Sequence, residues 1–388
     1  MYKVIEYELG ELLLYEQPGA YIVETTEYSD SYPVPVLTAG KSFILGYTND
    51  KTGIFDKLPV IIFDDFTTAT QYVNFPFKVK SSAMKILHVN RELVLPKYIY
   101  YRMQIIQFDH STHKRYWIQQ YSKIKIEIPP LDEQERIVAR IEELFSQLDS
   151  GVETLLKTKQ QLAVYRQAVL KEAFEGRLTD SVPEKIVRLG DFIEKPHYGT
   201  SKKCSYDNGS GRTAVYRIPN IDHRSGRISH EDIKYAQFNE SELDGIRLRQ
   251  GDILIIRSNG SVSLVGRAAI VCDTDITGTF AGYLMRLRIM EPESFLPKFL
   301  LLFLQSHLAR IYIENKAKST SGVHNINSTE ISDLQIPLYD PDTQYAIIEA
   351  IESRLSVCDS IEQTVDTALQ QAEAMRQSIL KQAFEGAL

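Results

Sequence analysis

The chain has 388 residues and a net charge of −7, and 43% of its residues are hydrophobic, which is enough for two or three domains with ordinary cores. It contains no apolar run near the roughly 18 residues of a membrane helix, and its start lacks the basic and apolar regions of a signal peptide. Its 3 cysteines are isolated and have no metal-ligand spacing. We therefore expect a reduced, metal-free, cytoplasmic protein without a membrane span.

The charge is distributed unevenly along the chain. Residues 1–128 carry 14 basic and 14 acidic side chains, and residues 186–335 carry 19 and 17. In contrast, residues 129–178 carry 7 and 9, and residues 336–388 carry 3 and 9; the short stretch 179–185 adds one further negative charge. A polyanion can therefore approach the two balanced segments without meeting the acidic ones.

Residues 1–128 are expected to form a mixed, strand-rich domain. Short runs rich in β-branched and aromatic residues, at 59–63 and 123–128, alternate with turn residues. The string LPKYIYYRM at 95–103 predicts a helix with a proline near its start. Trp117 is expected in the core rather than on a base.

Two segments of the chain repeat one another. Residues 134–178 match residues 344–388 at a constant offset of 210 without a gap, and 19 of 45 positions are identical. Apolar residues at steps of three and four predict two long helices that end near Gly176 and Gly386. Stripes of this length favour a coiled coil, and two copies in one chain favour an intramolecular antiparallel pair. The alternative is two amphipathic helices that pack separately, each on its own domain.

Residues 186–335 look like a diverged copy of the first globular segment. Strands are expected at 252–256 and 268–271, and LPKFLLLFL at 296–304 answers the helix of the first segment. Ile128-Pro129 and Ile336-Pro337 lie at an offset of 208, so the approach to the second long helix is predicted to be two residues longer than the first.

Loops of the second globular segment combine hydroxyl, amide and basic side chains, as DNA-approaching loops do. Arg257 can pair bidentately with guanine and Asn259 with adenine, each worth about 1–3 kcal/mol of discrimination. For any single residue, an ordinary solvated turn is the alternative. The DNA-binding candidates in these loops are Tyr198, Gly199, Thr200, Ser201, Lys202, Lys203, Arg257, Ser258, Asn259, Ser261, Lys316, Lys318, Ser319, Thr320, Ser321, His324 and Asn325.

The first globular segment offers three smaller groups of DNA-binding candidates. One group combines charge with an aromatic ring, a second is expected to face phosphates, and a third is a further candidate strip. In that order, they are Lys114, Arg115 and Tyr116; Lys78, Lys80, Ser81 and Ser82; and Thr38, Lys41 and Tyr47.

Motifs of catalysis are absent from the sequence. There is no GxxxxGK[ST] string for ATP, and Asn74-Phe75-Pro76-Phe77 lacks the proline and the preceding glycine-rich loop of an adenine methyltransferase. Asp64 and Asp65 have no accompanying nuclease set, so they are interpreted as solvated or structural acids. We expect this chain to catalyse nothing by itself.

Several strings resemble one protein family. IPPLDEQERIVARIEELFSQLD, followed by QAVLKEAFEGRL and a second copy at the C-terminus, resembles the conserved regions of the specificity subunits of type I restriction–modification systems. HYGTSKK, YRIPNID, GDILIIRSNGSVSLVGRA and SGVHNINSTEISDLQIP are similar to a target-recognition domain of that family, and VPVLTAGKSFILGY and FDDFTTATQYVNFPFKVKSSAMKIL to its N-terminal counterpart. The second of these strings adds Arg217 and Asn220 to the DNA-binding candidates.

The resemblance implies a fold and a domain order. It implies an α+β chain in which two mixed α/β target-recognition domains alternate with two long conserved helices that form an antiparallel coiled coil with an internal pseudo-two-fold repeat. The expected parts are target-recognition domain 1 at 1–128, spacer helix 1 at 129–178, a linker at 179–185, target-recognition domain 2 at 186–335 and spacer helix 2 at 336–388.

The resemblance also implies a function. Such a subunit binds a bipartite site in double-stranded DNA and recruits two methyltransferase subunits, which methylate adenine at N6, and restriction subunits. S-adenosylmethionine, ATP and Mg are then expected on the partner subunits and no cofactor on this chain. The alternative function is a coiled-coil scaffold that joins two protein-binding domains.

Overall fold

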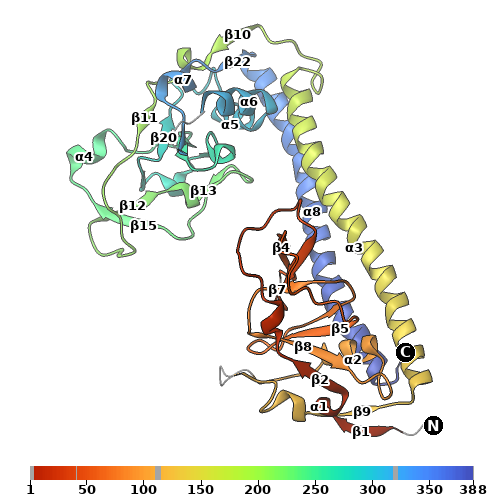
Figure 1. The fold of residues 1–388 in the computed structure, drawn as a ribbon. Helices are drawn as coiled ribbons and strands as arrows, with labels where there is room; N and C mark the ends of the chain where they lie inside the picture. The colour runs from red at the N-terminus through yellow and green to blue at the C-terminus, as the bar shows by residue number, and fades with distance from the viewer. Residues whose placement is uncertain (1–3, 41, 110–114, 318–321, 388) are drawn as a thin grey trace. The chain divides into compact units, whose positions relative to one another are not determined.

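The computed structural model describes residues 4–40, 42–109, 115–317 and 322–387. It divides into two compact units, unit 1 with residues 1–156 and 366–388 and unit 2 with residues 157–365. Each unit contains one globular part together with one end of both long helices (Figure 1).

The globular part of unit 1 is built on a four-stranded sheet in the order β2-β8-β5-β6 and a three-stranded sheet in the order β4-β3-β7. Residues of β5 alternate between two cores: Ile61 and Phe63 face the cluster that holds α2, and Val60 and Ile62 face the other sheet. A strand directs successive side chains to opposite faces. Because both faces of β5 are buried, the whole run is apolar. The elements are β1 (Ile5–Glu8), α1 (Leu9–Leu12), β2 (Leu13–Glu16), η1 (Pro18–Tyr21), β3 (Val34–Leu37), β4 (Ile44–Thr48), β5 (Val60–Asp64), β6 (Thr70–Val73), β7 (Lys78–Val79), β8 (Met84–Val89), α2 (Pro96–Met103), η2 (Tyr121–Lys123) and β9 (Lys125–Ile128).

The globular part of unit 2 has a six-stranded sheet in the order β11-β20-β16-β18-β14-β13 and a three-stranded sheet in the order β15-β12-β19. The alternation recurs in β16, where Ile253 and Ile255 pack toward α5 while Leu254 and Ile256 pack toward the second core. The elements are β10 (Lys185–Arg188), η3 (Leu189–Asp191), β11 (His197–Tyr198), β12 (Arg212–Tyr216), η4 (Ile218–Asn220), β13 (Ile221–Asp222), β14 (Arg227–Ile228), β15 (Lys234–Gln237), α4 (Glu240–Asp244), β16 (Ile253–Ile256), β17 (Ser258–Asn259), η5 (Val262–Leu264), β18 (Ala268–Ile270), η6 (Asp273–Asp275), β19 (Thr279–Phe280), β20 (Leu284–Leu287), α5 (Pro297–Gln305), α6 (His307–Lys316), β21 (His324–Asn325), α7 (Ser328–Ser332) and β22 (Gln335–Leu338).

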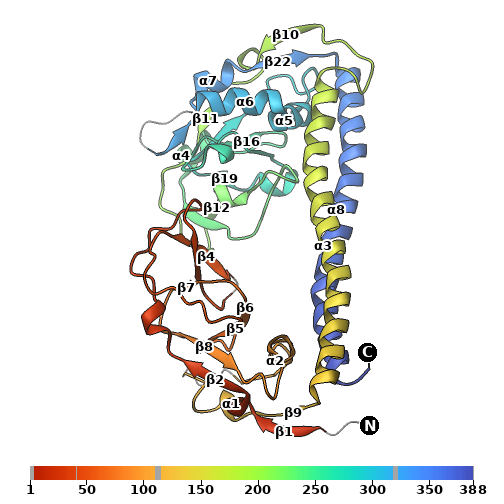
Figure 2. The same ribbon diagram turned by 45° about the vertical axis from the view of Figure 1, so that its right-hand side comes forward.

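The two long helices are α3 (Leu131–Phe174) and α8 (Pro341–Phe384), and both end before a glycine with positive φ, as predicted. Within each unit they lie side by side (Figures 1 and 2). In unit 2, Arg166 pairs with Asp359 at 2.6 Å, and in unit 1, Arg376 pairs with Asp149. Since the late part of each helix pairs with the early part of the other, the antiparallel coiled coil is confirmed.

The last turn of each long helix packs in the core of the globular part that does not directly precede that helix in the chain. The ring of Phe384 lies 5.2 Å from Tyr98 of α2, edge to face, and the ring of Phe174 lies 5.3 Å from Phe299 of α5. Separate packing of each helix on its own domain is therefore wrong, because each helix end contributes to the other domain's core.

A buried glutamine joins each long helix to its globular part in the same way. Gln134 accepts a hydrogen bond from Leu95 N at 2.8 Å and donates to Pro129 O at 2.8 Å. Gln344 accepts from Leu296 N at 2.9 Å and donates to Tyr339 O at 2.8 Å. Full hydrogen bonding makes these buried amides tolerable inside the core.

The strand registers correct the predicted offset of the Ile-Pro steps. β1 pairs with β9 so that Ile5 lies opposite Ile128, and β10 pairs with β22 so that Lys185 lies opposite Leu338. Ile128 therefore corresponds to Leu338, at the offset of 210, and the prediction of a longer second approach was wrong. Ile336-Pro337 lies inside β22, so that dipeptide recurs out of register with Ile128-Pro129.

Candidate nucleic-acid interface

Three chain segments that are distant in sequence meet in unit 2 beyond the end of β16. β17 pairs with β21, which places Ser258 opposite Asn325 and Asn259 opposite His324. The backbone of Arg257 donates to Tyr283 O at 2.9 Å. The structure thus brings together the candidates that follow β16 and those that follow α6.

Tyr198 belongs to the same cluster. Its ring centroid lies 4.4 Å from the guanidinium carbon of Arg257, and its hydroxyl accepts a hydrogen bond from Ser328 N at 3.0 Å. The next residue must be glycine, because a Cβ on Gly199 would lie 2.2 Å from Phe280 O. We call Tyr198, Arg257, Asn259, His324 and Asn325 the unit 2 cluster.

Other candidates of unit 2 already bind protein groups. Lys202 binds both carboxylate oxygens of Glu242 at 2.7 Å and thereby lowers the pKa of that carboxyl. Arg217 pairs with Asp232 at 2.9 Å. Asn220 is fully buried, and its amide donates to backbone carbonyls of the following turn. These residues hold loops, and burial corrects the expectation of DNA contact for Asn220 and for Ser258, which is also buried.

The remaining candidates of unit 2 lie at the surface. Ser201, Lys203 and Ser261 are exposed, and Thr200 is half-buried with its hydroxyl accepting from Lys202 N at 3.0 Å. Lys316 is exposed, with its ammonium 5.8 Å from the centroid of the Tyr312 ring. Lys318, Ser319, Thr320 and Ser321 lie outside the described residues.

In unit 1 the position of Arg257 is occupied by Asp65. Tyr116 N donates to Asp65 O at 2.9 Å, as Ile326 N does to Arg257 O at 2.9 Å. The buried Asp65 carboxylate accepts from Trp117 N at 2.8 Å and lies 3.4 Å from the ammonium of Lys85. Asp65 is therefore a structural acid, as predicted.

Two candidates of unit 1 are buried, which corrects the expectation that they contact DNA. Lys78 pairs with Asp50 at 2.7 Å and donates to Thr52 O at 2.5 Å, and the hydrogen bonds from Lys78 and Thr52 lower the pKa of Asp50 to about 2. Tyr116 packs edge to face on Phe108, with ring centroids 4.9 Å apart. Both side chains are buried in the core of unit 1.

The other candidates of unit 1 are more accessible. Lys80, Ser81 and Ser82 are exposed on the loop between β7 and β8. Arg115 is exposed, with its guanidinium carbon 6.0 Å from the centroid of the Phe66 ring. Thr38 and Tyr47 are half-buried, and Lys41 and Lys114 lie outside the described residues.

Sequence reasoning missed two exposed aromatic residues beside these groups. Tyr283 is 63% exposed next to Arg257, and Phe66 is 45% exposed beneath Arg115. In the sequence, each is only an aromatic residue in a turn beside an apolar strand. This signal points to a binding surface only when the cation that lies beside the ring in the fold is known. Exposed aromatic rings beside cations suit contact with bases or sugars.

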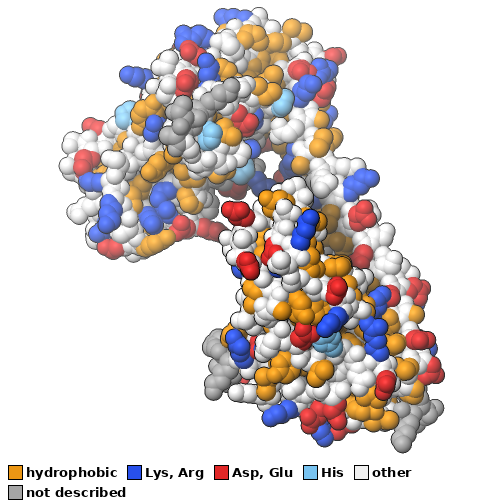
Figure 3. Space-filling model, viewed as in Figure 1, with side chains coloured by type: hydrophobic (Ala, Val, Ile, Leu, Met, Phe, Trp, Pro, Cys, Tyr) orange, Lys and Arg blue, Asp and Glu red, His pale blue; other side chains and the backbone are white. Residues whose placement is uncertain are grey.

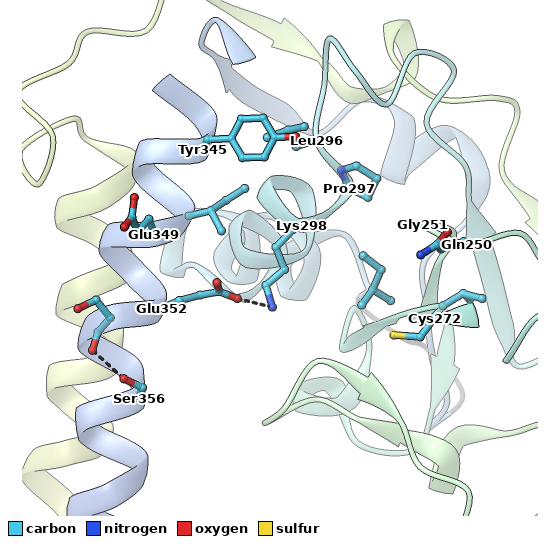
Figure 4. Close-up of a pocket in the computed structure, with 14 residues that line it drawn as sticks. Gln250, Gly251, Cys272, Leu296, Pro297, Lys298, Tyr345, Glu349, Glu352 and Ser356 are labelled. Atoms are coloured by element: carbon cyan, nitrogen blue, oxygen red, sulfur yellow. Dashed lines mark hydrogen bonds and ion pairs between the residues drawn. The ribbon is translucent and has the colours of Figure 1, made fainter. Parts of the chain in front are cut away.

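A cavity of unit 2 lies apart from this interface. It measures about 920 Å³ and lies in unit 2 between the start of α5, α8 and the end of β18 (Figure 4). Lys298 in its wall is paired with Glu352 at 2.9 Å, and Glu349 lines it as well. Carboxylates repel phosphate, so this cavity is a poor DNA site.

No broad basic face marks the surface that Figure 3 shows. Around β12, β15 and α4 of unit 2, Lys and Arg side chains are interspersed with Asp and Glu. In the part of the chain that the structure describes, no helix is long and apolar enough to cross a membrane.

The comparisons with known proteins decide the family. Residues 2–159 match the family model described as "Type I restriction modification DNA specificity domain". The specificity subunit of the type I restriction enzyme EcoR124I/EcoR124II from Escherichia coli is 31% identical over 377 residues, covering 91% of this chain and 87% of that protein. The chain belongs to the type I restriction enzyme specificity subunits. As a specificity subunit, it serves DNA sequence recognition.

Further similarities agree with this family. The specificity subunit of EcoKI from Escherichia coli (strain K12) is 31% identical over 278 residues, covering 69% of this chain and 58% of that protein. A solved structure described as concerning complex assembly and conformational transition of the type I R-M system covers 100% of both chains with a TM-score of 0.72. At 17% identity this likeness shows the fold alone: helices and sheets in two globular parts joined by long helices.

Proposed function

We propose that this subunit reads a bipartite site in double-stranded DNA, with the globular part of each unit reading one half. The observation that supports this is the duplication itself: the two parts share a framework but carry different side chains at corresponding positions, Asp65 in one and Arg257 in the other. Two copies of one reader would have no need to differ there. We propose 1–128 and 186–335 as the target-recognition domains.

The proposed interface of unit 2 is the unit 2 cluster with the exposed cations and hydroxyls around it. Arg257 and Asn259 are the base readers, since their side chains match the edges of guanine and adenine. Lys203, Lys316 and Ser261 are phosphate contacts, which position the duplex without reading it. In unit 1 the proposed interface comprises Arg115, Lys80, Ser81, Ser82, Thr38 and Tyr47.

The long helices are proposed to hold the two readers at a fixed spacing and to bind the partner subunits. Because the sequence repeats at an offset of 210, equivalent surfaces recur on both helices; Tyr165 is 47% exposed and its equivalent Met375 is 53% exposed. A pseudo-two-fold surface suits two identical partners. We propose two methyltransferase subunits there, which methylate adenine at N6, with restriction subunits joining the complex.

The chemistry is proposed to lie on those partners. S-adenosylmethionine would bind to the methyltransferase subunits, and ATP and Mg to the restriction subunits. This chain would select the sequence and catalyse nothing.

Single-molecule sequencing of host DNA, with and without this gene, tests the proposal. We expect one bipartite motif of N6-methyladenine, two fixed halves around an unspecified gap, to disappear with the gene. If no motif changes while the methyltransferase partner is expressed, the proposal is overturned.

The salt dependence of binding separates this function from a protein-binding scaffold. Each phosphate contact releases counterions, so DNA affinity must fall steeply between 50 mM and 200 mM salt, by about 10³-fold for six contacts. A flat salt dependence, together with retention of a protein ligand, would favour the scaffold.

A further inference from the structure

Arg257 in unit 2 is held in place by a backbone carbonyl and an aromatic ring. Its Nη1 donates to Gly282 O at 3.0 Å, and its guanidinium carbon lies 4.4 Å from the centre of the Tyr198 ring. Among the described residues, its buried Nε has no hydrogen-bond partner and no carboxylate forms an ion pair with it. An arginine stays charged in proteins, and the Nη donors of Arg257 that do not bind Gly282 O have no acceptor among the described residues.

Neighbouring arginines of unit 2 do not share this state. Arg217 is paired with Asp232, and Arg288 with Asp252 at 2.7 Å. These two arginines are committed to the fold, whereas Arg257 is positioned by an aromatic ring and a carbonyl. Arg267 and Arg286 are also held by backbone carbonyls and form no ion pair with a described residue, so what distinguishes Arg257 among the described arginines of unit 2 is the aromatic ring beside its guanidinium.

The aromatic ring that supports Arg257 is itself fixed at both ends. Its backbone lies in β11, where Tyr198 pairs with Met285 of β20. Its hydroxyl accepts a hydrogen bond from Ser328 N, the first residue of α7. The close approach of Gly199 to Phe280 O fixes the turn that follows. Ring and guanidinium therefore have one arrangement, which lowers the entropy cost of binding.

We propose that Tyr198 is a positioning residue that presets Arg257 to read a guanine in the half-site recognised by unit 2. The inference rests on the proposed function and adds the positioning role of Tyr198 and the atoms through which Arg257 reads the base. Each Nη carries two N–H groups, so Nη1 can hold Gly282 O with one while its other N–H and Nη2 face O6 and N7 of guanine. The Tyr198 ring, 4.4 Å from the guanidinium carbon, restricts the positions that the guanidinium can adopt.

The test uses the complete methyltransferase complex with this subunit and a duplex carrying the motif mapped in host DNA. Each guanine of the second half-site is replaced in turn by 7-deazaguanine, which removes the N7 acceptor. For the unmodified protein, one replacement is expected to weaken binding by about 10-fold to 100-fold. For Arg257→Ala the natural duplex should bind weakly, and the same replacement should cost nothing more.

Two substitutions of Tyr198 separate positioning from folding. Tyr198→Phe keeps the ring but loses the hydrogen bond from Ser328 N, and it should keep most of the 7-deazaguanine penalty. Tyr198→Leu removes the ring and should reduce that penalty several-fold. Lys203→Ala is the control, because a phosphate contact should weaken binding to every duplex by the same factor. If Tyr198→Leu does not fold, Arg257→Lys replaces it, since lysine keeps the charge but loses the planar fork.

The outcomes distinguish the two proposals. A complex that binds and methylates no specific DNA overturns the proposed function and this inference together. A complex that reads a bipartite motif, but whose second half lacks guanine or keeps its full penalty in Arg257→Ala, overturns the inference alone.

Discussion

Unit 1 and unit 2 place side chains of opposite charge on the same backbone framework. Asp65 and Arg257 each accept an N–H from the later segment on their carbonyl, at 2.9 Å in both units. Asp65 turns inward to Lys85 and Trp117, whereas Arg257 stacks on Tyr198. The duplicated backbone is therefore retained at this position, while the side chains that it carries differ in charge and in partners.

The strongest test of the duplication is a fragment of residues 186–388. It lacks α3, so the slot that Val169, Leu170, Ala173 and Phe174 fill in the unit 2 core is vacant. The end of α8 carries nearly the same string, LKQAFEGAL for LKEAFEGRL. We expect two fragments to dimerise, each inserting the end of α8 into the other.

Sedimentation of that fragment measures its association state. Phe384→Ala in the fragment should shift it toward monomer. In the dimer, the Phe384 ring of one fragment would take the place of Phe174 in the other, and the substitution removes that ring. A folded fragment that remains monomeric at high concentration would contradict the exchange of helix ends.

Removing the helix-end rings from the full chain sharpens the comparison of the two cores. Phe174 is 4% exposed, and Phe174→Ala should destabilise unit 2 by about 3–5 kcal/mol. Phe384 is only partly buried, so Phe384→Ala should destabilise unit 1 by less. Hydrogen exchange resolved along the chain measures each effect. If either variant lowered hydrogen-exchange protection equally in both units, the prediction that each ring stabilises its own core would be contradicted.

Much of this framework was predictable from sequence, because near-identical helix ends require near-identical slots. The short apolar, β-branched runs at 59–63 and 252–256 likewise predicted β5 and β16. The offset of the Ile-Pro steps misled, since two dipeptides carry less information than a hydrogen-bonded register. The stacking of Tyr198 on Arg257 could not be predicted, because it depends on how distant strands pair.

A buried lysine in unit 1 has a neutral equivalent in unit 2. Lys78 of β7 donates to Thr52 O, and Thr279 of β19, at the same position, donates to Ile246 O at 2.8 Å. Lys78→Met should destabilise unit 1 by about 1–3 kcal/mol, because the carbonyl loses its donor. Thr279→Val is the matched control and should cost unit 2 a similar amount.

The pair of Lys78 with Asp50 also predicts a pH dependence. The pKa of Asp50 is lowered to about 2, so its contribution to stability is complete above the ordinary pKa of 3.8 and is lost as pH falls through about 2. Denaturant unfolding of Lys78→Met between pH 5 and pH 2 should show a smaller acid-sensitive contribution, because the hydrogen bonds from Thr52 to Asp50 remain. Thr279→Val should retain it, and a loss in both variants would show that another group titrates.

The smallest expected effect concerns an exposed ion pair of unit 2. Arg224 pairs with Glu362 of α8, and the pKa of Glu362 is lowered chiefly by that hydrogen bond. Arg224 is largely exposed, so Arg224→Ala should cost at most about 1 kcal/mol and less at high salt. Arg166→Ala, which removes a less exposed partner of the same Glu362 and of Asp359, should cost more. Denaturant unfolding in low and high salt measures both; a larger, salt-independent loss from Arg224→Ala would mean that packing by its alkyl chain, and not charge, joins the 222–225 loop to α8 within unit 2.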